Sequence, residues 1–172
     1  MPGVLAIAAL ATGCFQPLYG TGSDPSRPGV RDALGAVDVL QIDAPANTSE
    51  SRLAVQVRND LLFNFTGGGS QSSPTHRLKV QIGGGRSVVS IDRATALPQV
   101  ESYGLRTTYS LTEIATGKVV VTGQASTNVS YDTLGQQRFA RISGMHDAER
   151  RAAKVISDNI TSRLASYFIS GS

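Results

Sequence analysis

Alternating apolar and polar residues in the middle of the chain predict antiparallel strands. Leu78, Val80 and Ile82 alternate with polar residues, and we expect the glycine run at 83–85 to end this strand before a short one at 88–91. Two longer alternating segments then flank a turn at 115–117. The residues expected on one face of this hairpin are Tyr103, Leu105, Thr107, Tyr109 and Leu111 on the first strand, and Val119, Val121, Ala125, Val129 and Tyr131 on the second. The other face is mainly polar, which is typical of a sheet covered on one side only.

Two segments have the apolar spacing of amphipathic helices. The first follows a short β-branched strand at 37–42, begins at a capping box formed by Asn47 and Glu50, and ends at Gly67. Its apolar stripe consists of Leu53, Ala54, Val57, Leu61 and Phe65. The stripe of the closing helix consists of Ala148, Ala152, Val155, Ile156, Ile160, Leu164 and Phe168. This order predicts an α+β domain in which two helices pack on one face of a four-stranded mixed or antiparallel sheet.

An apolar run at residues 4–11 leads into Leu10-Ala11-Thr12-Gly13-Cys14. The run is shorter than the ~20 residues that span a bilayer, and it fits the apolar region of a signal peptide. The small residues before the cysteine match a bacterial lipoprotein cleavage site, so we expect Cys14 to carry a diacylglycerol and an N-acyl chain. We divide the chain into a signal peptide at 1–13, a lipidated Pro/Gly-rich tether at 14–32 and a folded domain at 33–172. The alternative is that Cys14 is a buried free thiol.

Composition limits the chemistry of the folded body. The net charge of +3 is compatible with an anionic partner such as a phosphorylated lipid, but it is too small to argue for nucleic-acid binding. Neither His76 nor His146 has neighbouring ligands at metal-binding spacing, and the chain shows no nucleophile motif, phosphate loop or paired carboxylates. We therefore expect that the protein is not an enzyme, and that it has no cofactor or metal apart from the acyl chains on Cys14.

Basic residues in or beside the predicted sheet are the remaining candidates for binding. They are Arg77, Lys79, Arg86, Arg93, Arg106 and Lys118. Arginine and lysine bind phosphate groups through charge-assisted hydrogen bonds, so together they could form an anion site. Alternatively, each is a solvated charge that protects the sheet from edge-to-edge pairing.

Essentially the whole mature chain resembles the LPS-assembly lipoprotein LptE family, in its alphaproteobacterial branch, and two stretches are the most specific. They are the segment Cys14-Phe15-Gln16-Pro17-Leu18-Tyr19-Gly20 and the region 131–168, which includes Gln137-Arg138-Phe139-Ala140 and the closing helix. The resemblance implies two helices on a four-stranded sheet, in agreement with the pattern above. It also implies a lipid-anchored protein at the periplasmic face of the outer membrane. Such a protein plugs the LptD β-barrel, supports its assembly, and binds lipopolysaccharide during delivery to the outer leaflet.

Basic residues of that family bind the phosphates of lipid A. Sheet position and charge favour Arg106, Lys118 and Arg138 for this role, followed by Arg77 and Lys79. Two other classes of protein stay open. A pilotin-like or transporter-auxiliary lipoprotein would share the anchor and the α+β body but would bind another membrane complex. A periplasmic hydrolase is the enzymatic alternative, and the lack of a recognisable catalytic set argues against it.

Overall fold

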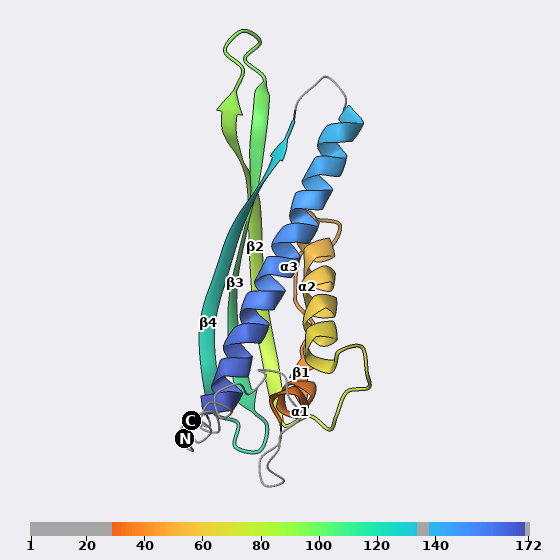
Figure 1. Ribbon diagram of the computed structural model, residues 1–172, viewed down its shortest axis with the longest axis vertical. Helices are drawn as coiled ribbons and strands as arrows, with labels where there is room; N and C mark the ends of the chain where they lie inside the picture. The colour runs from red at the N-terminus through yellow and green to blue at the C-terminus, as the bar shows by residue number, and fades with distance from the viewer. Residues whose placement is uncertain (1–28, 134–137, 171–172) are drawn as a thin grey trace, which may run out of the picture.

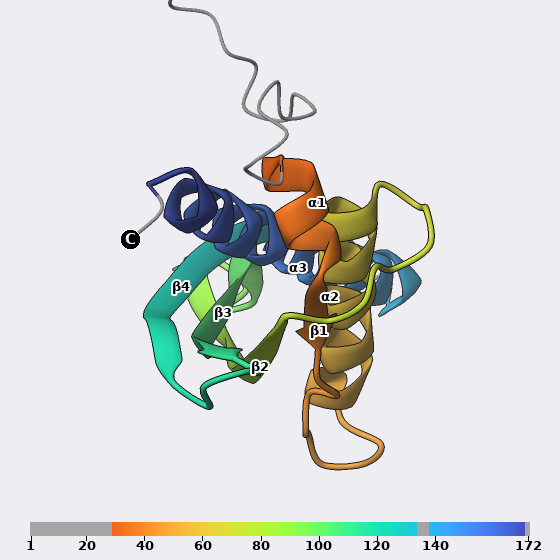
Figure 2. The ribbon, with the colours of Figure 1, turned by 90° about the horizontal axis from the view of Figure 1, so that it is seen from below.

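The structure, a computed structural model, describes residues 29–133 and 138–170 and confirms the α+β architecture. Its elements are α1 (Val30–Gly35), β1 (Val37–Val39), α2 (Ser49–Thr66), β2 (His76–Ile91), β3 (Pro98–Glu113), β4 (Val119–Asp132) and α3 (Arg138–Ser170). The four-stranded sheet has the order β1-β2-β3-β4; β1 is parallel to β2, and the other pairs are antiparallel. Helices α2 and α3 cover one face of the sheet (Figures 1 and 2). The short helix α1 is additional to the two predicted helices, and it begins within the segment 14–32.

The molecule is elongated because α3 and the strands β2, β3 and β4 are all long and run along the same axis (Figure 1). The 33 residues of α3 rise about 50 Å, and the 16 residues of β2 or β3 span about the same length. We call the end formed by α1 and the β3–β4 turn (residues 30–35 and 114–118) the base. We call the end formed by the β2–β3 hairpin and the start of α3 (residues 87–99 and 138–142) the tip.

The predicted apolar stripes form the core. All five predicted positions of α2 are buried, as are the five predicted positions of β3 and most of those of α3. Two predicted core residues are exposed instead. Val155 lies on a side of α3 that faces neither α2 nor the sheet, and Val119 lies at the start of β4 beside a register shift in the β3–β4 pairing. A helix stripe read from sequence is thus wider than the surface that packing covers.

The first helix boundary differs from the predicted one by one residue. Thr48, not Asn47, caps α2, because its hydroxyl accepts a hydrogen bond of 3.2 Å from the backbone N–H of Ser51. Asn47 has a positive φ of 62°, a conformation that asparagine tolerates better than most residues. The helix ends at Gly67 as predicted, again with a left-handed backbone (φ 63°).

The glycine run at 83–85 does not interrupt β2, which contradicts the predicted strand break. These residues pair in register with residues 104–106 of β3. A Cβ at Gly84 would overlap the hydroxyl of Tyr103 and lie 2.9 Å from its Cζ atom, whereas a Cβ at Gly83 would meet nothing within 4 Å. Gly84 is therefore a space requirement of the buried tyrosine ring and not a turn signal.

We predict that Gly84→Ala destabilises the protein by about 1–3 kcal/mol, because the new methyl group displaces the buried ring of Tyr103. The matched control is Gly83→Ala, one residue away in the same strand. It should be neutral or stabilising by up to about 1 kcal/mol, since a methyl group there only restricts the unfolded chain. Urea unfolding of both variants measures the difference. Equal losses would show that the glycines serve the strand backbone and not the tyrosine.

Candidate functional site

The basic residues of the central strands lie on the uncovered face of the sheet. Arg77 and Lys79 of β2 and Arg106 of β3 are exposed and point away from the helices, since they occupy the register positions that alternate with the core. Between them lie mostly hydroxyl and amide side chains. Arg77 forms an ion pair of 3.7 Å with Asp38 of β1. This outer face is therefore polar, mildly basic and open to solvent.

The structure does not bring all five sequence-predicted cations together. Arg106 is paired opposite Gly83, four residues along β2 from Lys79, which corresponds to about 13 Å. Lys118 lies in the turn at the base. Arg138 is the first residue of α3, at the tip, but its side chain and Cys14 lie outside the residues described. The cations thus form a spread along the long axis and not one pocket.

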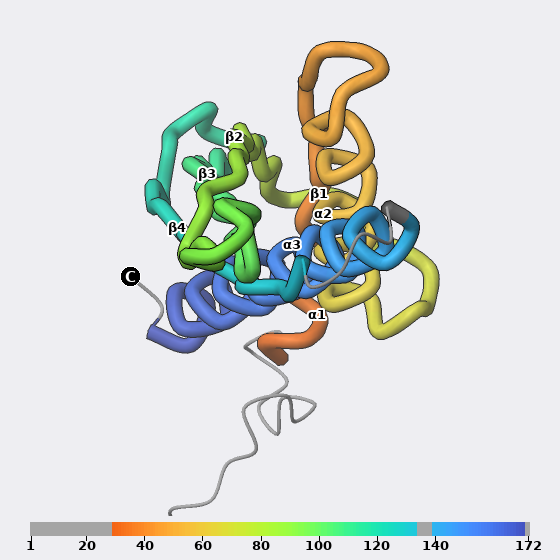
Figure 3. The backbone as a smooth tube through the Cα atoms, turned by 90° about the horizontal axis from the view of Figure 1, so that it is seen from above, coloured from red at the N-terminus to blue at the C-terminus, as the bar shows by residue number. Residues whose placement is uncertain are grey.

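Exposed apolar side chains gather at the tip. Among the described residues, half of the large hydrophobic side chains that face solvent belong to this end: Val88, Val89, Ile91, Leu97, Phe139 and Ile142. Phe139, in the first turn of α3, is 87% exposed. Figure 3 looks down on this end of the molecule. The β2–β3 hairpin extends beyond the helices here (Figure 1), while Phe139 and Ile142 lie in the first turns of α3.

A buried carboxylate fastens the start of α3 to the sheet below the tip. Glu101 accepts a hydrogen bond of 2.6 Å from the Tyr131 hydroxyl and another from Arg141 of α3. Burial raises the pKa of Glu101, but the hydrogen bonds from Tyr131 and Arg141 outweigh burial, so the pKa lies below its ordinary value. Burial and the bond to Glu101 raise the pKa of Tyr131 to about 12. At neutral pH, the start of α3 is therefore joined to the sheet below the tip by an ionised, hydrogen-bonded carboxylate.

The loop at the end of the hairpin is held by Asp92. Its carboxylate accepts hydrogen bonds from the backbone N–H groups of Ala94 (2.7 Å) and Thr95 (3.0 Å) and from the side-chain amide of Gln99 (3.0 Å). The backbone bonds from Thr95 and then Ala94 lower the pKa of Asp92. The neighbouring Arg93 is exposed and forms no ion pair with any described residue.

The tip therefore combines apolar side chains with the exposed Arg93, and the exposed Arg86 lies just before the tip on β2. An apolar surface beside cations is suited to an amphiphile with an anionic head group. The sequence analysis named both arginines but missed the apolar residues around them. The signal was the pair Val88-Val89, because two adjacent apolar residues in a strand must place one side chain on each face.

The histidines lie apart from the tip and from each other. His76 is half-buried at the start of β2, and its ring meets Phe168 edge to face with centroids 5.2 Å apart. His146 is exposed within α3, eight residues after the helix begins at Arg138. The described residues contain no group of three metal-ligating side chains. None of the described helices has both the length and the apolar composition needed to cross a bilayer.

Comparison with solved structures finds the same fold in bacterial lipoproteins. A candidate lipoprotein from Caulobacter crescentus CB15 superposes with a TM-score of 0.61 at 19% identity, covering 84% of this chain and 98% of that chain. Rare lipoprotein B from Shewanella oneidensis gives 0.56 at 12% identity, covering 78% and 96%. The minor lipoprotein from Acinetobacter baumannii gives 0.54 at 15% identity, covering 77% and 92%.

Neither a protein-family model nor a curated protein matches the sequence. At these identities, the solved structures establish a shared fold. The chain thus shares its fold with these proteins, and the fold has the two helices on a four-stranded sheet that the resemblance to the LptE family led us to expect.

We predict that Arg141→Met lowers the stability at pH 7 by about 1–3 kcal/mol, because it leaves the buried Glu101 carboxylate without its cationic partner. The ion pair contributes fully above the ordinary glutamate pKa of 4.5 and is lost as the pH falls through the lowered pKa of Glu101. The difference from the wild type should therefore shrink below about pH 4.5. Urea unfolding over a pH series measures it.

The matched control is Arg150→Met, which removes an exposed ion pair with Asp147 on the same helix. This change should cost no more than about 1 kcal/mol. If both variants lose equally at pH 7, or if the loss in Arg141→Met is the same at pH 3, Glu101 does not depend on Arg141.

Proposed function

We propose that this protein is a lipid-anchored outer-membrane lipoprotein of the LptE family that acts by binding and not by catalysis. In this role it plugs the LptD β-barrel, supports barrel assembly, and binds lipopolysaccharide on its way to the outer leaflet. The observation that carries the proposal is the combination of a lipoprotein cleavage pattern at Cys14 with the fold of rare lipoprotein B. The acyl chains on Cys14 are the expected covalent group.

The tip supplies both kinds of contact that lipopolysaccharide needs. The acyl chains of lipopolysaccharide favour the exposed apolar residues around Val89 and Ile91. Its phosphates favour the exposed guanidinium groups of Arg93 at the tip and of Arg86 just before it on β2. Arg138 begins α3 at the same end. The other cations predicted from the sequence lie on the polar outer face or at the base, and they are the alternative candidates for binding the phosphates: Arg77, Lys79, Arg106 and Lys118.

The outer face of the sheet supports the role of a barrel plug. The lumen of a membrane β-barrel is lined mainly by polar side chains. The exposed outer positions of β3 and β4 are likewise polar: Arg106, Thr108, Thr122, Gln124, Ser126, Asn128 and Ser130. This face can therefore lie against a polar wall without burying unpaired apolar surface.

Affinity purification of the lipidated protein from its own membranes tests the barrel partnership. We expect an outer-membrane β-barrel of the LptD type in stoichiometric amount. Recovery of a secretin or of an inner-membrane transporter complex instead would favour the pilotin-like or auxiliary alternative. Cys14→Ser supplies the anchor control, because no other cysteine can accept the lipid. In cells without the barrel, the Cys14→Ser chain should leave the membrane fraction.

For the lipid ligand, we predict that Val89→Asp combined with Arg93→Asp weakens binding to purified lipopolysaccharide at least about tenfold, because it removes one apolar contact and reverses one charge. The matched control is Ile114→Asp combined with Lys118→Asp, an exposed apolar and basic pair in the other hairpin. It should change binding by less than about twofold. Wild-type binding should also weaken with salt, since exposed charges are screened over ~8 Å at physiological ionic strength.

Equilibrium binding measures these affinities, with circular dichroism as the folding control. Arg106→Asp is measured alongside as a single variant of the outer face. The tip assignment is wrong if the Ile114→Asp/Lys118→Asp variant or Arg106→Asp loses affinity while the Val89→Asp/Arg93→Asp variant does not. The phosphate site would then lie among the cations of the outer face and the base.

A further inference from the structure

The two edges of the sheet differ in how many of their outward backbone groups have hydrogen-bond partners. The edge at β1 is only three residues long, and side chains from distant segments occupy its outward carbonyls. Arg58 donates to the carbonyl of Val39 at 3.1 Å, and Gln71 donates to the carbonyl of Val37 at 3.0 Å. This edge offers no free row of backbone groups for another strand.

The edge at β4 is 14 residues long and largely open. The carbonyl of Ala125 faces β3, where the Thr107 hydroxyl donates to it at 3.2 Å, and Thr133 donates its N–H to Gln99 of the same neighbour. Alternation along the strand then turns the backbone groups of the even-numbered residues outward. Arg151 of α3 donates to one of these outward carbonyls, that of Ser130, at 3.3 Å.

The outward groups of Thr122, Gln124, Ser126 and Asn128 have no hydrogen-bond partner in the described part of the chain. They repeat about every 6.8 Å, which is the two-residue repeat of the backbone groups that a neighbouring extended strand presents. Exposed edges are usually protected by lysine, proline or a short length. β4 has neither lysine, arginine nor proline, and its one charged residue is Asp132 at the far end.

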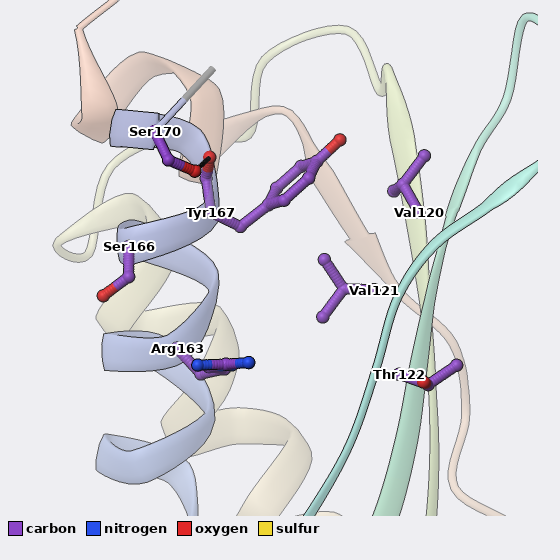
Figure 4. Close-up of a pocket in the computed structure, with 7 residues that line it drawn as sticks. All are labelled: Val120, Val121, Thr122, Arg163, Ser166, Tyr167 and Ser170. Carbon is purple, nitrogen blue, oxygen red and sulfur yellow. Dashed lines mark hydrogen bonds between the residues drawn. The ribbon is translucent and has the colours of Figure 1, made fainter. Parts of the chain in front are cut away.

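A groove lies beside this edge, between the start of β4 and the end of α3. It has a volume of about 440 Å³ and is lined by Val120, Val121, Thr122, Arg163, Ser166, Tyr167 and Ser170. Figure 4 shows Arg163 and Tyr167 extending from α3 toward β4, with Val121 pointing back toward them. Arg163 is exposed and forms no ion pair with any described residue.

We propose that the open edge of β4 and this groove together form a docking site for an extended segment of a partner protein, which adds to the sheet as a fifth strand. The backbone of the segment pairs with the outward groups of residues 122–128. Its side chains on the helix side enter the groove, where an acidic residue meets Arg163 and apolar neighbours meet Val121 and Tyr167. The site is separate from the tip and independent of the lipid ligand.

Charge fixes the chemistry of the segment. An acidic side chain gains a charge-assisted hydrogen bond from the unpaired guanidinium, while a basic one is repelled by it. A second copy of this chain fits less well, because the one carboxylate of β4, that of Asp132, belongs to the even-numbered residues on the outer face of the sheet, whereas Arg163 lies on the helix side.

The test uses the full lipidated chain in detergent and two capped synthetic peptides, Thr-Val-Thr-Glu-Thr-Val-Thr and the same sequence with lysine in place of glutamate. Fluorescence anisotropy should show the glutamate peptide binding at least about tenfold more tightly than the lysine peptide. Arg163→Glu should reverse this preference. Hydrogen exchange should slow at the amides of Gln124, Ser126 and Asn128 when the glutamate peptide is bound.

Gln124→Pro tests the backbone pairing, because it removes an outward N–H and leaves the ladder with β3 intact. It should weaken peptide binding at least about tenfold, while the matched Gln124→Ala, which keeps the N–H, should not. A glutamate peptide methylated on alternate amide nitrogens should also fail to bind, and this arm needs no change in the protein.

Three results would overturn the proposal. They are the absence of binding by the glutamate peptide, equal binding of both peptides before and after Arg163→Glu, and unimpaired binding of the N-methylated peptide. A dimer of the free chain in sedimentation that Gln124→Pro dissociates would assign the edge to a second copy instead. None of these results bears on barrel recovery or lipopolysaccharide affinity, so this proposal and the proposed function can fail separately.

Discussion

The contact between α3 and the inner face of β3 and β4 holds the molecule together. These long strands present an apolar inner face to α3, which is of similar length, while α2 packs against β1, β2 and α3. Buried alanines at 148, 152, 153 and 165 let the helix approach closely, while Ile156, Ile160 and Leu164 fill the space between strands and α2. The apolar tip follows from the same geometry, since the β2–β3 hairpin extends beyond the helices.

Sequence pattern predicted what depends on local spacing. The five buried positions of α2 and the five of β3 were all placed correctly, because a helical stripe and a strict alternation are each set by the neighbouring residues. The pattern failed where a distant residue decides the outcome. Gly84 resembled a strand break until the ring of Tyr103, which arrives from the next strand, explained it. Val155 fitted the stripe of α3 but lies where neither layer reaches it.

The candidate sites were also predictable only where neighbouring residues determine them. The sequence placed the cations in or beside the sheet, and it could not separate those at the tip from those at the base, because that distance depends on strand length and register. The open edge of β4 was equally hidden. Whether an edge is closed depends on side chains such as Arg58 and Gln71, which reach β1 from other segments of the chain.

The elongated shape also defines a length scale. The described chain begins at the base, just before α1, and its long axis measures at least about 50 Å by the rise of α3. A bilayer with its head groups is about 40–45 Å thick. A body of this length that stands upright within a bilayer reaches from one leaflet to the other, whereas a body lying flat does not. Tilt relative to the membrane normal, and not further folding, would therefore decide which leaflet the tip can touch.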